Sequence, residues 1–195
     1  MGVFYAGWRW GLGCQWVLII VSWTRNEFKH PLHRTNNASL FKRILQSPVI
    51  LPTHNMSASL ALSSPSDYEV ATLGQIFTPQ AIVDCMCTLV RNSGRVLEPA
   101  CGDGAFLRHF PGALGIEIDP RHTPPDAEVM NFFELAEDEL FDTIIGNPPY
   151  VRYQDISPGT RRLARGSVLD KRSNLYLFFI EKCLRHLETG GELIF

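Results

Sequence analysis

Short apolar runs alternate with helical or polar segments from residue 95 onward, and no other sequence feature constrains the fold as strongly. Four runs have the length and composition of buried strands, at 95–100, 113–119, 127–131 and 141–146. A fifth run begins at Gly191, after a helical pattern. Strands that alternate with helices form a parallel sheet with helices on both faces. We therefore predict a doubly wound, mostly parallel α/β fold.

Three segments in this region or just before it have helical character. Residues 79–91 carry apolar side chains at helical spacing, and we expect Thr78 as the N-cap and Pro79 in the first turn. Residues 105–110 form a shorter helical pattern. Residues 174–188 form an amphipathic pattern, for which Gly190 is the expected C-terminal cap.

The charge balance divides the chain into two parts. Residues 1–56 hold six basic residues and one acid, which leaves twelve basic and nineteen acidic residues for the remainder. We expect 1–55 to be an unrelated or spurious N-terminal extension, 56–70 a flexible lead-in, and 71–195 a partial catalytic domain. The apolar stretch at 7–23 is short for a spanning helix, which needs about 20 apolar residues. A membrane or export segment remains the alternative for this stretch.

Cysteine usage and net charge restrict the compartment and the partners. Five cysteines, an odd number without a C-x2-C pair, indicate reduced thiols in a cytoplasmic protein and predict no metal site. The acidic balance of the main part argues against nonspecific wrapping of nucleic acid, which needs clustered basic residues. Any contact with DNA is then local, or is made by a part outside this sequence.

A glycine-rich turn follows the first predicted strand. In Glu98-Pro-Ala-Cys-Gly-Asp-Gly104, the two glycines allow a sharp turn and the close approach of a ligand. Glu98 and Asp103 would repel a phosphate, and no lysine accompanies the turn. The same acids would attract the amino and sulfonium groups of S-adenosyl-L-methionine. We therefore predict this cofactor rather than a nucleotide phosphate.

The next two strands end in residues suited to a nucleoside. Glu117 stands at the end of the second strand, where a carboxylate can accept both ribose hydroxyls. Asn131 and Phe132 follow the third strand, where an amide can bond an adenine edge and a ring can cover its face. Each feature alone has an ordinary structural explanation, but their occurrence at successive strand ends favours a binding site.

The fourth strand runs into Asn147-Pro-Pro-Tyr150. Two prolines end the ladder, and the residue before a proline is held extended. The carboxamide oxygen of Asn147 and the carbonyl of Pro148 can then both accept hydrogen bonds from one –NH2 group. These two hydrogen bonds would direct the nitrogen lone pair at an electrophile through orientation and electrostatics, without a strong base. Tyr150 offers a stacking face for a planar target, which a duplex base reaches only by flipping out.

These elements resemble the gamma class of DNA adenine methyltransferases, known from type I and type IIG restriction–modification systems. The resemblance covers residues 71–195 and implies a Rossmann-like methyltransferase sheet that is incomplete at the C-terminus. It implies catalysis by the Asn-Pro-Pro-Tyr element and transfer from S-adenosyl-L-methionine to the N6 amino group of adenine in DNA. Site residues that the resemblance implies are catalytic Asn147, Pro148, Pro149 and Tyr150, and cofactor-binding Phe77, Thr78, Pro79, Glu98, Ala100, Gly102, Gly104, Glu117, Ile118, Asn131 and Phe132.

The sequence departs from this family in two respects. Asn131 replaces the family's usual aspartate. The later strands and the target-recognition domain would lie beyond Phe195, so a missing recognition domain or specificity subunit is an expected partner. The basic segment 151–173, with Arg152, Arg161, Arg162, Arg165, Lys171 and Arg172, is either a phosphate contact or an ordinary solvated loop.

Three alternatives remain at this point. Protein glutamine N5-methyltransferases use the same Asn-Pro-Pro-Tyr element, although Phe77-Thr78-Pro79 is not known from that group. RNA adenine methylation is a related possibility. The third alternative is a non-catalytic remnant that at most binds the cofactor.

Overall fold

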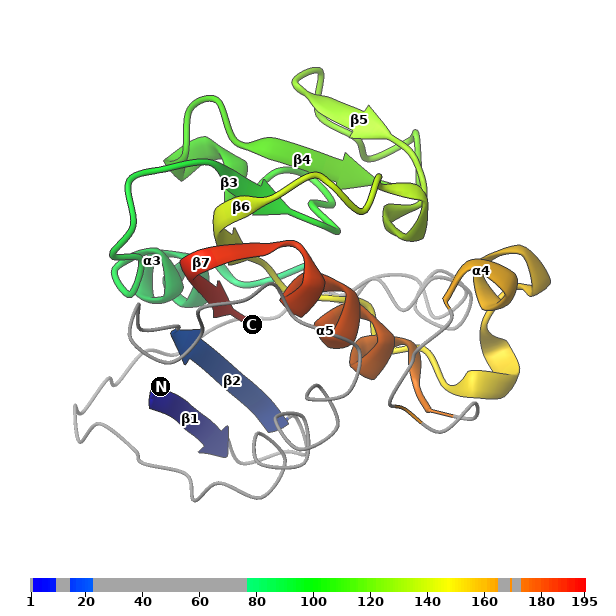
Figure 1. Cartoon of the computed structure of the whole chain (residues 1–195), viewed down its shortest axis with the longest axis horizontal. Helices are drawn as coiled ribbons and strands as arrows, with labels where there is room; N and C mark the ends of the chain where they lie inside the picture. The colour runs from blue at the N-terminus through cyan, green and yellow to red at the C-terminus, as the bar shows by residue number, and fades with distance from the viewer. Residues whose placement is uncertain (1, 10–14, 23–76, 165–168, 170–172) are drawn as a thin grey trace.

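The computed structural model describes residues 2–9, 15–22, 77–164, 169 and 173–195. Its strands form one seven-stranded sheet in the order β1-β2-β7-β6-β3-β4-β5 (Figure 1). The strands are β1 (Gly2–Arg9), β2 (Gln15–Ser22), β3 (Val96–Glu98), β4 (Leu114–Glu117), β5 (Ala127–Val129), β6 (Phe141–Ile145) and β7 (Leu187–Ile194). The helices are α3 (Gln80–Cys87), α4 (Pro158–Leu163) and α5 (Leu175–Arg185). Single 3-10 turns are η1 (Leu107–His109), η2 (Phe132–Glu134) and η3 (Tyr153–Asp155).

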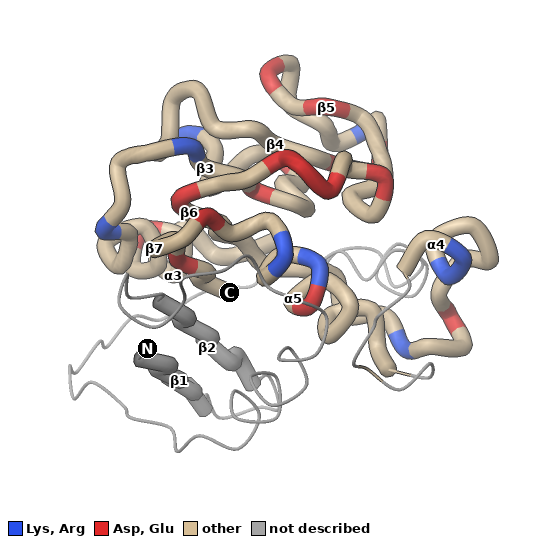
Figure 2. Tube along the Cα trace, viewed as in Figure 1, with Lys and Arg blue, Asp and Glu red and all other residues tan. Residues whose placement is uncertain are grey.

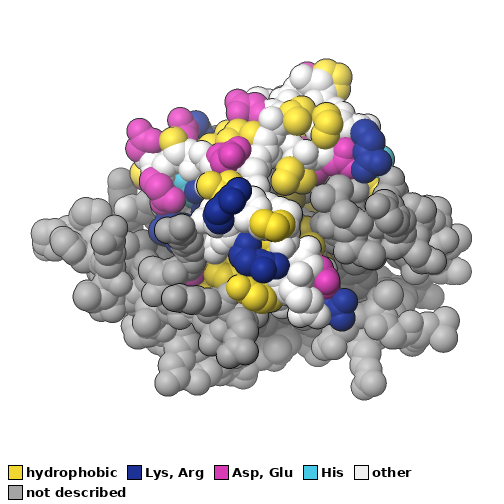
Figure 3. Space-filling model, turned by 90° about the vertical axis from the view of Figure 1, so that its right-hand side faces the viewer, with side chains coloured by type: hydrophobic (Ala, Val, Ile, Leu, Met, Phe, Trp, Pro, Cys, Tyr) yellow, Lys and Arg dark blue, Asp and Glu magenta, His cyan; other side chains and the backbone are white. Residues whose placement is uncertain are grey.

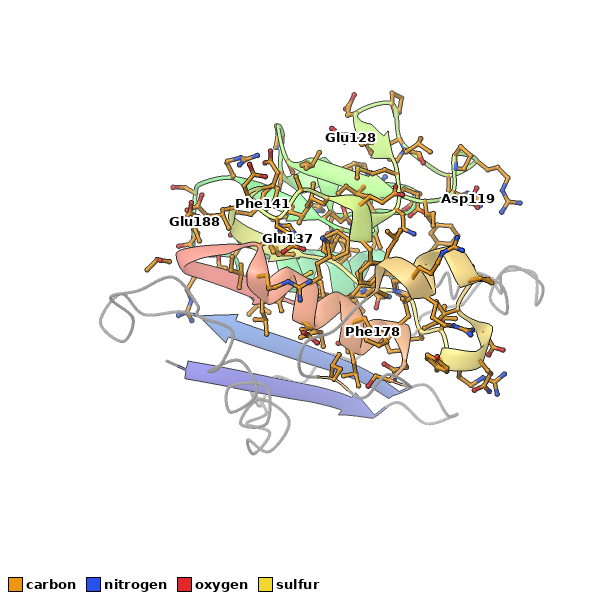
Figure 4. The ribbon with its side chains drawn as sticks, turned by 45° about the vertical axis from the view of Figure 1, so that its right-hand side comes forward. Asp119, Glu128, Glu137, Phe141, Phe178 and Glu188 are labelled. Atoms are coloured by element: carbon orange, nitrogen blue, oxygen red, sulfur yellow. The ribbon has the colours of Figure 1, made fainter. Side chains whose placement is uncertain are left out.

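The five strands from β3 to β7 are parallel, which confirms the predicted sheet. Strand β3 is central, with β4 on one side and β6 on the other, and β5 and β7 pair outside them. The carboxyl ends of these strands therefore lie along one edge. Figure 4 shows Asp119, just after β4, on the opposite side of the molecule from Glu188 near the start of β7.

Helices cover both faces of the sheet. Neighbouring residues of one strand point to opposite sides, so each face has its own cluster of buried side chains. Ile144 of β6 and Leu193 of β7 pack in the cluster that includes α5. Their neighbours Ile145 and Ile194 pack against Val83 and Met86 of α3, in the second cluster. All four strand residues are fully buried. The fold is thus doubly wound, as the alternation of strands and helices predicts.

The N-terminal strands extend the sheet at the β7 edge. Strands β1 and β2 pair antiparallel along their whole length, and Ile20–Ser22 of β2 pairs antiparallel with Glu192–Ile194 of β7. The predicted extension thus contains two strands of this sheet, whereas the lead-in at 56–70 lies outside the described residues. In the part of the chain that the structure describes, no helix is long and apolar enough to cross a membrane.

The start and end of α3 differ from the prediction. Pro79, rather than Thr78, is the N-cap, because its carbonyl accepts hydrogen bonds from Ile82 and Val83. The helix ends at Cys87, before the predicted limit of residue 91. The backbone N–H groups of Arg91 and Asn92 instead donate to the buried Glu192 carboxylate at 2.8 and 2.9 Å. These hydrogen bonds hold the segment after α3 against β7, although the apolar periodicity predicts that the helix continues there.

The prediction for Gly190 as a helix cap is wrong. Helix α5 begins after Asn174, whose side chain accepts a hydrogen bond from Leu177, and ends with His186 as its C-cap. The carbonyl of His186 accepts a hydrogen bond from Phe141, so β7 starts at the next residue and includes Gly190.

The predicted helix at 105–110 is only a 3-10 turn, η1. Gly104 precedes this segment with a φ of +76°, and Gly112, with a φ of +84°, follows it closely. Left-handed backbone at both glycines confines any helical conformation to the residues between them.

Candidate functional site

A cavity lies at the carboxyl edge of the parallel sheet and joins most of the predicted site residues. Contributions come from the turns after β3, β4, β5 and β6, which is where ligands bind in open parallel sheets. The lining residues that the sequence predicted are Phe77, Ala100, Gly102, Glu117, Ile118, Asn131, Phe132, Asn147 and Pro149. The remaining lining residues are Pro99, Met130, Phe133, Val151, Asp155, Ile156, Ser157, Thr160, Leu175 and Phe179.

The glycine turn is fastened to the end of β4. Gly102 has a φ of +52°, a region that favours glycine, and its N–H donates to Oε2 of Glu117 at 2.8 Å. The Phe77 ring lies 3.4 Å from the position that a Cβ on Gly102 would take. Phe77 is 42% exposed. The turn, the acid and the aromatic ring thus form one wall of the cavity.

The second glycine of the turn has a different neighbour. A Cβ on Gly104 would lie 2.7 Å from Cγ of Pro124. The close approach at Gly104 is therefore to the protein itself and not to the cavity, contrary to the expected role in ligand approach.

Glu117 is buried and is held from two sides. Its Oε1 accepts a hydrogen bond from the N–H of Asp119 at 2.9 Å, in addition to the bond from Gly102. The buried Asp119 carboxylate pairs with Arg121, and these hydrogen bonds hold the pKa of Asp119 well below its usual range. Ile118, between the two acids, is 48% exposed and lines the cavity.

Glu98 lies at the end of β3, beneath the glycine turn, and is 2% exposed. Burial raises the pKa of Glu98 well above its ordinary value, and a backbone hydrogen bond from Leu107 opposes the rise. Its Oε2 is buried and makes no hydrogen bond. A buried acceptor without a donor is costly, and a bound donor or cation would relieve that cost. Burial also raises the pKa of Cys101 in the same turn to about 12, which favours the protonated thiol.

Both polar atoms of the Asn131 amide form hydrogen bonds within the protein. As the N-cap of η2, its Oδ1 accepts a hydrogen bond from the N–H of Phe133 at 3.1 Å. Its Nδ2 donates to Oγ1 of Thr160, in α4, at 2.9 Å. Each end retains the capacity for one further hydrogen bond, because the oxygen has a second lone pair and the nitrogen a second hydrogen.

Phe132 is supported from behind by α5. Its ring centroid lies 5.0 Å from that of Phe179, and Nζ of Lys182 lies 5.5 Å from the ring. Lys182 is buried and donates to the carbonyl of Leu135 at 2.9 Å. Burial lowers the pKa of Lys182. The wall beyond the third strand is therefore packed against α5.

The Asn-Pro-Pro-Tyr element follows β6 directly. Asn147 and Pro149 line the cavity, and Pro148 is buried. Tyr150 is 43% exposed and stacks on Tyr176 of α5, with ring centroids 4.9 Å apart and planes 14° apart. Burial raises the pKa of Tyr150. The phenol ring is thus fixed at one face by the neighbouring helix.

The structure does not bring every predicted site residue to the cavity. Pro79 begins α3 and Thr78 precedes it. Along with these two, Glu98, Gly104, Pro148 and Tyr150 are absent from the lining. Residues 74–76, directly before Phe77, lie outside the described residues.

Several lining residues were missed by the sequence interpretation. Asp155, Ile156, Ser157 and Thr160 come from the segment after Tyr150, and no local pattern marks them as a wall of the cavity. Phe179 lies on the apolar face of α5. The amphipathic period predicts that this face is buried, but it does not predict that Phe179 lines the cavity.

Part of the basic segment after the Asn-Pro-Pro-Tyr element is hydrogen-bonded within the protein. Nη2 of Arg161 donates to the carbonyls of Tyr153, Gln154 and Ile156, and its guanidinium lies 4.6 Å from the centroid of the Tyr153 ring. Arg152 pairs with Asp155 at 2.8 Å. The predicted contact residues Arg165, Lys171 and Arg172 lie outside the described residues.

The charges on the described surface are unevenly placed. Figure 2 shows basic positions on α4 and acidic positions on β5 and around β4. On the face that α4 occupies, basic side chains lie beside hydrophobic ones (Figure 3). A polyanion would therefore meet its complement near α4 rather than near β5.

Comparisons with known proteins find one matching family model and several similar proteins. Residues 117–195 match the family described as Eco57I restriction-modification methylase. The type II methyltransferase M.TthHB8I of Thermus thermophilus is 39% identical over 155 residues, covering 68% of this chain and 36% of that protein. The type II methyltransferase M.HincII of Haemophilus influenzae is 32% identical over 137 residues, covering 64% and 27%.

A viral protein shows the same similarity. The type II methyltransferase M.CvrRI of Paramecium bursaria Chlorella virus XZ-6E is 33% identical over 136 residues, covering 62% of this chain and 35% of that protein. The matched part of the chain thus spans between about a quarter and about a third of the length of these relatives.

Proposed function

Because residues 117–195 match the Eco57I restriction-modification methylase family, we propose that this chain binds S-adenosyl-L-methionine and transfers its methyl group to the N6 amino group of adenine in DNA. The observation that carries the proposal is one cavity lined by both Glu117 and Asn147. An acid suited to a ribose and an amide suited to an exocyclic amine thereby face the same space.

The residues present fit this cofactor. Glu98 does not line the cavity, but its Oε2 is a buried acceptor without a hydrogen bond at the base of the glycine turn, and it would suit a cationic amino group held there. Glu117 retains lone pairs for hydroxyl groups after accepting its two backbone hydrogen bonds. Asn131 and Phe132 would hold the purine. When bound, S-adenosyl-L-methionine supplies an electrophilic methyl group.

Asn147 and the carbonyl of Pro148 would hold the amine of the target. Both are acceptors, so they bind two N–H bonds and leave the nitrogen lone pair free to attack. Pro148 and Pro149 restrict the backbone on which these acceptors stand, which lowers the cost of orienting the target. Tyr150, stacked on Tyr176, would cover one face of the flipped base.

DNA is the proposed partner, and a recognition domain or specificity subunit outside this chain would read its sequence. Two observations support a local role of this chain in that contact: Arg152 is exposed beside the catalytic element, and basic positions lie on α4. A phosphate contact of this kind positions a duplex but carries no sequence information.

The test uses the whole chain and a radiolabelled methyl donor. We expect calorimetric binding of S-adenosyl-L-homocysteine and labelled methyl in DNA, with N6-methyladenine recovered after digestion. Label in a glutamine-containing peptide or in RNA, and not in DNA, would favour the alternative substrates. Binding without transfer to any of the three would make the chain a cofactor-binding remnant, and no binding would overturn the proposal.

A further inference from the structure

The hydrogen bond between Asn131 and Thr160 joins two walls of the cavity that lie 29 positions apart in the sequence. Asn131 follows β5, whereas Thr160 lies in α4, beyond the Asn-Pro-Pro-Tyr element. Both residues line the cavity, and Thr160 is 9% exposed. A part-buried hydrogen-bonded pair at a cavity wall fixes the direction in which its polar atoms point.

The surrounding hydrogen bonds define the orientation of the Asn131 amide. The backbone N–H of Phe133 can only donate, so the atom that faces it must be the oxygen of the amide. The nitrogen then faces Oγ1 of Thr160. This oxygen also accepts a hydrogen bond from Oγ of Ser157 at 3.1 Å, and Oγ of Ser157 accepts one from the N–H of Thr160. The hydroxyl of Thr160 is therefore held in place as an acceptor.

An amide fixed in this way has one N–H and one lone pair left for a ligand. This pair of groups, a donor beside an acceptor, complements a 6-aminopurine edge, where an amino donor lies beside a ring-nitrogen acceptor. A 6-oxopurine presents an acceptor where the amino group was, so its oxygen would face the amide oxygen. An aspartate at the same position would offer acceptors only.

We infer that Thr160 is a positioning residue: its hydroxyl fixes the Asn131 amide so that Asn131 selects a 6-aminopurine over a 6-oxopurine in the cofactor pocket. The inference rests on the proposed function, because it takes the cofactor to be the purine ligand. It assigns to α4, which follows the catalytic element, a part in choosing the cofactor.

The test compares two ligands that differ only at the purine, S-adenosyl-L-homocysteine and S-inosyl-L-homocysteine. Calorimetry on the whole chain should give a preference for the adenosyl compound of at least about tenfold, the scale of leaving a buried polar group unpaired. Thr160→Val keeps the shape of the side chain and removes the hydroxyl, and it should reduce this preference severalfold. Thr160→Ser restores the hydroxyl and should restore the preference.

Asn131→Ala is the reference for complete loss of the preference. The ratio of the two affinities is the decisive quantity, because a general loosening of the pocket weakens both ligands alike. Thermal unfolding of each variant shows that it is folded. A ratio that stays at the original value in Thr160→Val would overturn the inference, as would a ratio near one in the unchanged chain.

Failure of the proposed cofactor binding, on which the inference rests, would look different. The unchanged chain would then bind neither compound, and the result would be seen before any variant is made.

Discussion

Oε2 of Glu117 lies 2.8 Å from the backbone nitrogen of Gly102, so the acid at the end of β4 also holds the glycine turn after β3. Two parts of the cavity wall that come from different strands are thus one unit. A ligand that bonds to this carboxylate meets a group whose position is already set, which reduces the entropy lost on binding.

Glu117→Ala should weaken the binding of S-adenosyl-L-homocysteine by about 1.5–3 kcal/mol, the scale of hydrogen bonds to a charged group. Calorimetry measures the change. Glu128→Ala is a matched control, because Glu128 lies on β5 but is exposed and does not line the cavity (Figure 4). An unchanged dissociation constant in Glu117→Ala would contradict the assigned role.

Asn147→Ala should lower methyl transfer by about 10²–10³-fold, the scale of losing one preorganised polar group at a reacting centre. Cofactor affinity should stay within about twofold, because Asn147 stands on the target side of the proposed site. Single-turnover transfer of labelled methyl and calorimetry on the same preparation give both values. Normal turnover in this variant would remove Asn147 from the mechanism.

Tyr150→Ala should lower kcat/KM for DNA. The decrease should correspond to about 1–3 kcal/mol of lost transition-state stabilisation, the range for loss of stacking on one base. Tyr150→Phe keeps the ring and its stack on Tyr176, so its activity should stay near that of the unchanged chain. Steady-state rates at several DNA concentrations separate the two variants. Equal losses in both would mean that the hydroxyl, and not the ring, is what the reaction uses.

Glu98 should make stability depend on pH. Because burial raises its pKa well above 4.5, the folded chain holds a proton here that the unfolded chain releases. This group's stabilising contribution is therefore full below pH 4.5 and is lost as pH rises through the folded pKa. Glu98→Gln cannot ionise, so it should gain stability relative to the unchanged chain as pH rises.

Urea denaturation of the ligand-free chain at about pH 5 and about pH 8 measures this effect through the free energy of unfolding. The difference between Glu98→Gln and the unchanged chain should be larger at the higher pH. A difference that is the same at both values would show that Glu98 does not titrate between them.

Gly104→Ala should cost more stability than Gly112→Ala. Both glycines have positive φ, so both substitutions carry the backbone cost of about 1–2 kcal/mol. A Cβ at Gly104 would also meet Cγ of Pro124 at 2.7 Å, whereas nothing lies within 4 Å of a Cβ at Gly112. Thermal unfolding compares the stabilities of the two variants. Equal losses of stability would mean that Pro124 moves aside at no cost.

The strand ends of this fold could be predicted because their signals are local. Glu98 and Glu117 each close an apolar run, and Asn147 stands before two prolines, so sequence alone places them at one edge of a parallel sheet. The same local reasoning explains why Asn131 is assigned to the pocket.

The parts that could not be predicted depend on contacts between distant residues. Glu192 ends the first helical segment by accepting hydrogen bonds from Arg91 and Asn92, about a hundred positions earlier in the chain. Thr160 reaches Asn131 from a segment with no repeating pattern. In both cases a tertiary hydrogen bond decides the outcome, and periodicity contains no information about it.

The cavity wall includes residues as far apart in the sequence as Phe77 and Phe179. These residues are neighbours only in the folded chain, so a molecule that fills the cavity has no comparable place to bind once the chain unfolds. Occupancy consequently raises the melting temperature in proportion to the logarithm of ligand concentration. A dye-based melting curve, without any nucleic acid present, can therefore rank cofactor analogues by how well they fit.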